Sequence, residues 1–295
     1  MNRYTVNPDE IYDQYIPEET ADDFLERVRH KDICRYTIQR IFSGDWVEVK
    51  IFPEWKKRTS VPKKGEKSPD AKQRHNKKEA INKLTRILNH NFEPYKDYFL
   101  TLTCDNKHLV FDEETGFEMV EKAIRRIKYQ YKKAGVELKA VYKVEIKRAK
   151  RSDSSYIRAA DGRQLYRPHL HIVMNDGIDW ETVESAWAIG ENKKIEMLHW
   201  SPLGFYKLAK YLCKDTKKGR RRWSSTANIV KPPPPKTTYS DKQGRKNRVF
   251  EITKNRNLHK EYFEQLMPEY DFVESESTFS EFGGGCYIHA RMARR

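Results

Sequence analysis

The first third of the chain shows two patterns of hydrophobic residues, one typical of strands and one typical of a helix. Residues 36–55 contain two strand-like stretches with Ser43 and Gly44 between them, which predicts a β-hairpin. Further on, apolar residues recur at helical spacing up to about Asn91 and predict an amphipathic helix. The apolar stripe of this helix consists of Ile81, Leu84, Ile87 and Leu88.

From residue 98 onward, strand-like and helical patterns follow one another in a regular order. The predicted elements are a strand over 98–104, a helix over about 116–134, strands over 138–147 and 169–174, a helix that begins at Asp179, a strand near 194–198 and a helix that begins at Ser201 and Pro202. The first six elements match the split βαβ, ferredoxin-like arrangement, in which two helices cover one face of an antiparallel sheet. The sequence therefore predicts an α+β fold with the other face of the sheet open to a ligand.

Composition changes divide the chain into three parts. Residues 1–92 are predicted to be an N-terminal extension with the hairpin and a basic amphipathic helix, and residues 93–230 to be the α+β domain. The four prolines Pro232–Pro235 fit neither a helix nor a central strand. Residues 231–295 are therefore predicted to be a linker and a C-terminal extension that packs on the core.

Three residues in two neighbouring predicted strands form a candidate metal site. His169 and His171 are separated by one residue, so in a strand both imidazoles point to the same face. Glu145 lies in the preceding strand and is the natural third, oxygen ligand. Two nitrogens and one carboxylate leave positions open for a phosphate oxygen. The alternative is that one histidine caps the loop after Pro168 and the other packs in the core.

The last predicted helix of this domain carries two candidate nucleophiles. Tyr206 and Tyr211 flank its apolar face on opposite sides, and helical geometry does not choose between them. Lys207 and Lys214 lie one turn before and after Tyr211, where ammonium groups favour a phenolate and hold a phosphate, so Tyr211 is the first choice. The alternative for either tyrosine is to anchor the helix to the core.

The charge of the chain points to a polyanionic partner. The 295 residues carry a formal net charge of +15, which favours nucleic acid because neutralised phosphates release counterions. Residues 220–223, Arg220, Arg221, Arg222 and Trp223, are the best candidate for a contact with DNA, with an ordinary solvated charge run as the alternative. No apolar run is long enough to span a bilayer and no secretory signal is visible, so a cytoplasmic location without membrane contact is expected.

Several of these residues, in this order, resemble a known superfamily. Thr-Leu-Thr at 101–103, the His-hydrophobic-His of residues 169–171 and the Tyr-x-x-Lys of residues 211–214 resemble the His-hydrophobic-His (HUH) endonucleases that initiate rolling-circle replication. Flanking segments are similar to the replication-associated (Rep) proteins of filamentous-type phages, prophages and related bacterial elements, and the likeness covers roughly residues 40–295. Members of that family often have a second overlapping Tyr-x-x-Lys unit, whereas here position 207 is lysine.

The resemblance implies a mechanism and partners. Mg²⁺ or Mn²⁺ on the histidine and glutamate ligands would bind the scissile phosphate of single-stranded origin DNA while Tyr211 attacks it, leaving a 5′-phosphotyrosine and a 3′ hydroxyl that primes a polymerase. Lys214 would orient the phosphate or act as an acid, and Lys207 would assist. The chain has no phosphate-binding loop motif, so a host helicase is implied along with the bacterial host's polymerase. The alternatives are a single-tyrosine HUH transposase or relaxase, or a non-catalytic DNA-binding phage regulator.

Overall fold

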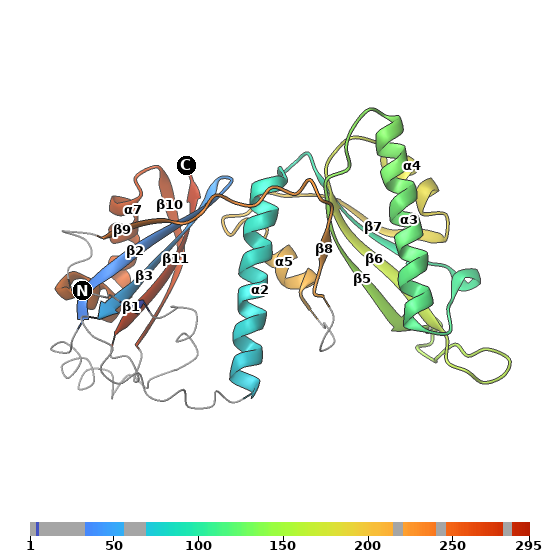
Figure 1. Ribbon diagram of the computed structural model, residues 1–295, viewed down its shortest axis with the longest axis horizontal. Helices are drawn as coiled ribbons and strands as arrows, with labels where there is room; N and C mark the ends of the chain where they lie inside the picture. The colour runs from blue at the N-terminus through green and yellow to red at the C-terminus, as the bar shows by residue number, and fades with distance from the viewer. Residues whose placement is uncertain (1–3, 6–32, 56–68, 215–220, 240–245, 280–284) are drawn as a thin grey trace. The chain divides into compact units, whose positions relative to one another are not determined.

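The computed structural model (Figure 1) describes residues 4–5, 33–55, 69–214, 221–239, 246–279 and 285–295. The chain forms two compact units. The first unit combines the N-terminal part up to His90 with residues 201–207 and 231–295, and the second consists of residues 91–200 and 208–230. Each unit contains its own antiparallel sheet, which confirms the predicted α+β class.

The first unit is built on a six-stranded sheet. Its strands run in the order β10-β11-β3-β2-β9, and β1 pairs with the far end of β3. These strands are β1 (Tyr4–Thr5), β2 (Ile33–Ser43), β3 (Trp46–Trp55), β9 (Lys236–Tyr239), β10 (Tyr270–Phe279) and β11 (Cys286–Arg294). The predicted hairpin is confirmed as β2 and β3, although β2 continues through Ser43 and the turn is formed by Gly44 and Asp45.

The two faces of this sheet differ in chemistry. Helices α6 (Lys246–Lys254) and α7 (His259–Leu266) cover a face of alternating apolar residues, such as Ile38, Val49 and Ile288. The other face carries charged residues, and side chains of α2 (Pro69–Asn91) bind them. The C-terminal strand β11 thus completes the sheet begun by the N-terminal hairpin. Residues 231–295, predicted to be a linker and a C-terminal extension that packs on the core, belong to this first unit.

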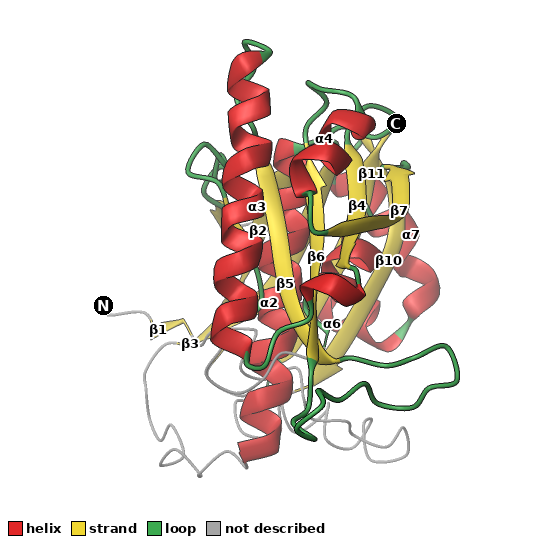
Figure 2. Ribbon diagram, turned by 90° about the vertical axis from the view of Figure 1, so that its right-hand side faces the viewer, coloured by secondary structure: helices red, strands yellow, loops and turns green. Residues whose placement is uncertain are grey.

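The second unit contains the predicted series of strands and helices. The elements are β4 (Tyr98–Cys104), a short 3₁₀ helix (Asn106–His108), α3 (Glu113–Lys133), β5 (Ala140–Arg148), β6 (Tyr166–Met174), α4 (Trp180–Trp187), β7 (Gly190–Met197), the end of α5 (Tyr206–Leu212) and β8 (Ser224–Ser225). The strands run in the order β7-β4-β6-β5-β8, all antiparallel, and Figure 2 shows the first four side by side. Asp112 and Asp179 cap α3 and α4 through their side chains, as predicted for Asp179.

Strand alternation separates a covered face of this sheet from a face that carries polar side chains. Leu100, Leu102, Leu170 and Ile172 are buried against α3 and α4, which lie on one side of the sheet in Figure 1. Their neighbours in β4 and β6, at 101, 103, 169 and 171, therefore point to the opposite face. The histidine-bearing strand β6 lies between β4 and β5, so partners reach it from both sides.

Helix α5 begins later than the sequence suggests. Ser201 and Pro202 were predicted to start it, but the helix starts at Tyr206. Residues 202–205 form turns in which Gly204 has a φ of +58°, a conformation that suits glycine. The Phe205 N–H donates to the Asn89 side chain at 2.9 Å, so the helix receives its cap from a distant residue. Among the described residues, no helix is both long and apolar enough to cross a bilayer.

Candidate active site

The two histidines of β6 are each held by a threonine of β4. Thr101 lies opposite His171 and Thr103 lies opposite His169 in the β4–β6 register. The threonine oxygens are 3.1 Å from His171 Nδ1 and 3.0 Å from His169 Nδ1. A partner at Nδ1 fixes the orientation of an imidazole and leaves Nε2 to bind a ligand. His171 is buried, whereas His169 is half-buried.

Glu145 joins these histidines from the strand on the other side. It lies opposite His169 in the β5–β6 register, and its carboxylate Oε2 is 3.3 Å from His171 Nε2. Two lysines of β5 also bind this carboxylate, with Lys143 Nζ at 2.6 Å and Lys147 Nζ at 2.5 Å. Glu145 is therefore a partly buried anion that already attracts three nitrogen groups.

Of the two candidate tyrosines, Tyr211 lies at this cluster. Its hydroxyl oxygen is 3.4 Å from His171 Nδ1, and its ring meets the rings of His171 and Phe99 edge to face. Tyr206 instead lies in the first unit, where the Arg291 guanidinium is 4.7 Å from its ring centroid. The structure thus brings Tyr211 together with His171 and Glu145, and it gives Tyr206 a different neighbour.

The ionisation of these groups follows from burial and from the nearby cations. Burial lowers the pKa of His169 to about 4, aided by the positive charge of Lys147, so the ring is neutral near pH 7. Burial alone would raise the pKa of Glu145, but hydrogen bonds from His171, Lys143 and Lys147 hold that pKa well below its usual value. The site therefore pairs a neutral imidazole with an ionised carboxylate, the forms that bind a metal.

The phenol of Tyr211 does not have the lowered pKa that its lysine neighbours suggested. Burial and the charge of Glu145 raise this pKa, and the cations that oppose the rise are Lys147 and Lys194. Lys207 and Lys214 were expected to favour the phenolate, but the cations that lower this pKa in the structure are Lys147 and Lys194. Lys207 is exposed, while the backbone carbonyl of Lys214 accepts a hydrogen bond from Lys143.

The chemistry of the donor atoms at this site suits a divalent cation. As the side chains stand, no three histidine, cysteine or carboxylate groups of the described residues lie together as the ligands of one ion. Glu145 is bound by lysine ammonium groups, and a cation would have to replace or share those contacts. Two imidazoles with anchored Nδ1 atoms and one ionised carboxylate are nevertheless a donor set of the kind that binds Mn²⁺ or Mg²⁺ with open positions.

Three of the four predicted DNA contacts, Arg221, Arg222 and Trp223, lie near the edge of the same sheet. Arg220 lies outside the described residues. Arg221 is exposed and Arg222 and Trp223 are half-buried, and they lead directly into β8, which pairs with β5. Sequence reasoning did not assign roles to Thr101, Thr103, Lys143 or Lys147. The available signal was alternation in the two strands beside the histidines: Thr101 and Thr103 are two positions apart, and each lysine lies two positions from Glu145. This spacing becomes informative only when the register is known.

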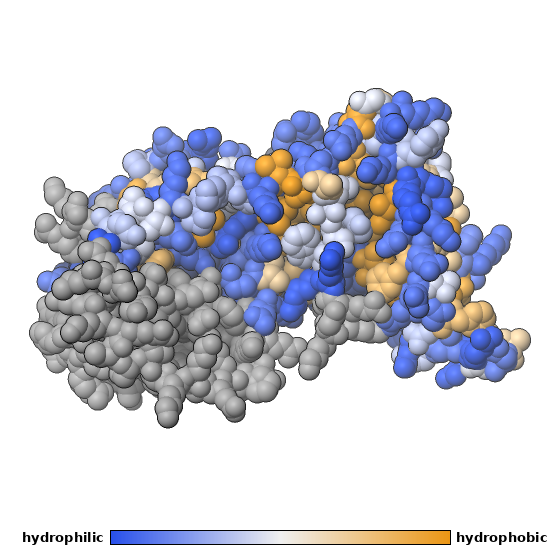
Figure 3. Space-filling view, in the orientation of Figure 1, coloured by the Kyte–Doolittle hydropathy of each residue, from blue (hydrophilic) through white to orange (hydrophobic). Residues whose placement is uncertain are grey.

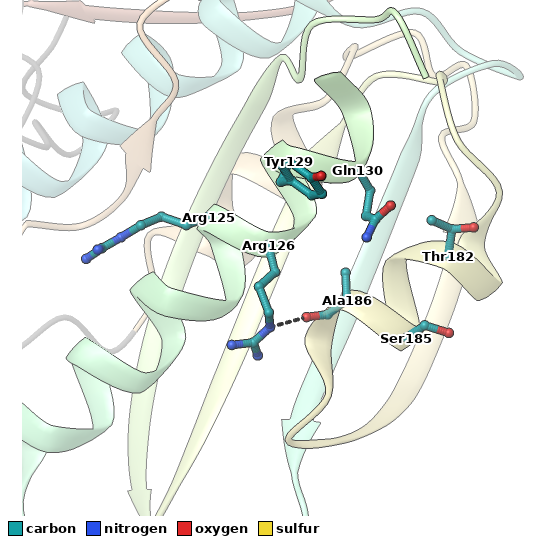
Figure 4. Close-up of a pocket in the computed structure, with 7 residues that line it drawn as sticks. All are labelled: Arg125, Arg126, Tyr129, Gln130, Thr182, Ser185 and Ala186. Carbon is teal, nitrogen blue, oxygen red and sulfur yellow. Dashed lines mark hydrogen bonds between the residues drawn. The ribbon is translucent and has the colours of Figure 1, made fainter. Parts of the chain in front are cut away.

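The described part of the chain also holds a pocket on the helix-covered side of this unit. It lies between α3 and α4 and has a volume of about 600 Å³ (Figure 4). Within it, the Arg126 guanidinium donates to the carbonyls of Ala186 at 2.7 Å and Trp187 at 2.6 Å, so this cation caps the end of α4. The pocket is separate from the histidine cluster, which occupies the opposite face of the sheet.

Comparisons of the chain with protein-family models, with curated proteins and with solved structures found no match.

Proposed function

We propose that this protein is a metal-dependent DNA nicking and joining endonuclease that initiates rolling-circle replication through a 5′-phosphotyrosine intermediate. The observation that carries the proposal is the position of Tyr211. The Tyr211 hydroxyl oxygen is 3.4 Å from His171 Nδ1, and His171 Nε2 is 3.3 Å from the Glu145 carboxylate. A nucleophile within reach of a potential metal-ligand set is what tyrosine-based phosphoryl transfer requires.

The topology of the second unit supports this proposal. Its strands follow one another in the chain as β4, β5, β6 and β7, with α3 after the first and α4 after the third, and they lie in the order β7-β4-β6-β5. We take this to be the ferredoxin-like, split βαβ arrangement. Two helices then cover one face, and the histidine pair on a central strand occupies the other, as the resemblance to the HUH endonucleases implies.

In the proposed mechanism, His169, His171 and Glu145 hold Mg²⁺ or Mn²⁺. When bound, the metal would polarise the scissile phosphate and offset its negative charge. Thr101 and Thr103 keep the imidazoles aligned, because each hydroxyl contacts Nδ1 and leaves Nε2 as the ring nitrogen that would bind the metal.

The chain itself supplies the nucleophile and its positioning. The Tyr211 oxygen attacks phosphorus, a tyrosine–phosphate bond forms and the phosphorus–O3′ bond breaks. The phenol loses its proton, and the departing 3′ oxygen gains a proton. One phosphate ester bond replaces another, so the step needs no energy-rich cofactor. Burial and the charge of Glu145 raise the pKa of Tyr211, so the phenol enters this step protonated. Lys214, two residues after α5, is proposed to orient the phosphate or act as an acid, with Lys207 assisting.

The proposed substrate is single-stranded DNA at a replication origin of a phage or related bacterial element. The net charge of +15 supports a nucleic-acid partner. Arg221, Arg222 and Trp223, at the edge strand beside β5, are proposed DNA contacts. The 3′ hydroxyl would be extended by a host polymerase, with a host helicase unwinding the duplex.

The proposal is tested by incubating the full chain with labelled single-stranded origin DNA and Mn²⁺ or Mg²⁺. We expect a DNA adduct that survives denaturing electrophoresis and that disappears with EDTA or in Tyr211→Phe. An adduct formed equally well by Tyr211→Phe would contradict the assignment of the nucleophile. No adduct with either ion, despite DNA binding, would favour a non-catalytic DNA-binding regulator.

A further inference from the structure

The segment that joins β5 to β6, residues 149–165, is a folded arm rather than an irregular loop. Its backbone closes on itself at three points: Ala149 N–H donates to Leu165 O, Ile157 N–H to Ala149 O and Leu165 N–H to Ile157 O, at 2.8, 2.9 and 3.3 Å. Figures 1 and 2 show it extending beyond the ends of β5 and β6. We call residues 149–165 the basic arm.

The arm together with its base carries an excess of positive charge. The arm and its base, residues 147–167, contain seven lysines and arginines and two acidic residues. Both acids are used in turns: Asp153 Oδ1 accepts from Ser155 N–H at 2.9 Å, and Asp161 Oδ1 accepts from Arg163 N–H at 3.0 Å. Figure 3 shows the arm, at lower right, as mostly hydrophilic surface. The four cations of the arm, Lys150, Arg151, Arg158 and Arg163, are exposed, and Arg163 also pairs with Asp161 at 2.7 Å.

Two aromatic rings lie beside these cations and remain open to solvent. Phe111 is 48% exposed, and the Arg163 guanidinium lies 4.2 Å from its ring centroid. Tyr156 is 44% exposed, with the Lys150 ammonium 5.1 Å from its ring centroid. An exposed ring flanked by a cation is suited to a single-stranded nucleic acid, in which bases stack on the ring and phosphates meet the charge.

The position of the arm relates it to the proposed site of cleavage. Ala149 follows Glu145 by four residues and Leu165 precedes His169 by four, which is about 13 Å along each strand. Side chains alternate along a strand, so Arg148 points to the face of the sheet opposite to Glu145. The cations at the base of the arm therefore lie on both faces at this end of the sheet. The arm is therefore placed to hold DNA that flanks the cleaved phosphate, not the phosphate itself.

We propose that the basic arm binds single-stranded DNA next to the cleavage site, with bases stacked on Phe111 and Tyr156 and phosphates paired with the arm's cations. The assignment of the flanking strand rests on the proposed endonuclease function, whereas binding itself does not require cleavage. An anionic membrane would also attract these charges. It is the less suitable partner, because two separate rings do not form the continuous apolar face that inserts into a bilayer.

The test measures binding of the full chain to a fluorescent dT20 oligonucleotide by anisotropy, with EDTA present to prevent cleavage. Phe111→Leu and Tyr156→Leu keep an apolar side chain but remove the ring, and each is expected to weaken binding by about five- to a hundredfold. Arg163→Gln is expected to reduce the slope of log affinity against log salt by about one. The matched control is Tyr129→Leu, a 63% exposed tyrosine on α3 outside the arm, which should change affinity less than about twofold.

The outcomes separate this proposal from the endonuclease proposal. Wild-type affinity for dT20 in both ring variants, or an equal loss of affinity in Tyr129→Leu, would overturn the role of the arm. If the arm variants lose dT20 binding and wild type forms no covalent adduct, the arm stands and the endonuclease proposal fails. If both proposals hold, the ring variants raise the DNA concentration needed for adduct formation and keep the wild-type rate at saturating DNA.

Discussion

At the scale of single residues, the candidate site depends on hydrogen bonds that a list of ligands would omit. His169 and His171 each have a threonine partner at Nδ1, and both threonines come from the strand beside them. Without these hydroxyls an imidazole can rotate or change its protonated nitrogen, and its nitrogen lone pair is no longer aimed at a metal.

Substitution of these threonines tests whether they support a metal site. Thr101→Val and Thr103→Val keep the β-branched shape but remove the hydroxyl, and each is expected to weaken Mn²⁺ binding by about 10- to 100-fold. Titration of free Mn²⁺ by electron paramagnetic resonance measures this change. Thr182→Val, which lies in the pocket between α3 and α4, is the control. Unchanged Mn²⁺ affinity in both strand variants would show that the hydroxyls do not support metal binding.

At the scale of elements, one lysine connects β5 to the end of the tyrosine helix. Lys143 is buried, and its ammonium donates both to Glu145 Oε1 and to the backbone carbonyl of Lys214, just after α5. Lys147 also binds Glu145, but its side chain is 61% exposed. Both lysines therefore stabilise the Glu145 carboxylate. Among the described contacts, it is Lys143 that donates the hydrogen bond to the end of α5.

This difference predicts unequal effects of two matched substitutions. Lys143→Met should slow adduct formation by about 10²-fold at saturating Mn²⁺ and DNA, because the end of α5 loses its anchor and Tyr211 shifts from its position. Lys147→Met should reduce the rate by less than about tenfold. Single-turnover kinetics measure both rates, and thermal unfolding checks that each variant is folded. Equal effects of the two substitutions would show that the link to α5 is unimportant.

The elements of the second unit could largely be predicted from the sequence, but their contacts could not. Alternation in 169–174 shows that both histidines share a face, and this follows from local geometry alone. The pairing of Thr101 with His171 depends on a register between strands some 70 residues apart, which local patterns do not determine. Likewise, the start of α5 depends on Asn89, a residue more than 100 positions away.

At the scale of the whole molecule, a buried charged cluster ties the two ends of the chain together within the first unit. Glu48 of β3 accepts two hydrogen bonds from Arg86 of α2, at 2.8 and 2.6 Å, and one from His289 of β11 at 2.9 Å. Burial would raise the pKa of Glu48, but these partners hold it well below its usual value. The strand pairing that completes this sheet was not predictable, because β3 and β11 are separated by most of the sequence.

This cluster predicts how stability depends on pH. Because the pKa of Glu48 is lower in the folded than in the unfolded state, its contribution is complete above the unfolded pKa, near 4.5, and is lost as pH falls below it. Glu48→Gln should lower the free energy of unfolding by about 3 kcal/mol near neutral pH, since it leaves Arg86 without its anion. Urea denaturation at about pH 7 and pH 3.5 should show wild type losing about 1.4 kcal/mol more than the variant. Equal losses would mean that Glu48 is not a strongly paired anion.

The most direct test of the central claim is to identify the residue that carries the DNA. After reaction with single-stranded origin DNA and Mn²⁺, the protein is digested with a protease and the DNA-linked peptide is sequenced by mass spectrometry. We predict a 5′-phosphate ester on the tyrosine of the peptide that contains Tyr211, in wild type and in Tyr206→Phe alike. A modified Tyr206, or no DNA-linked peptide at all, would contradict the account.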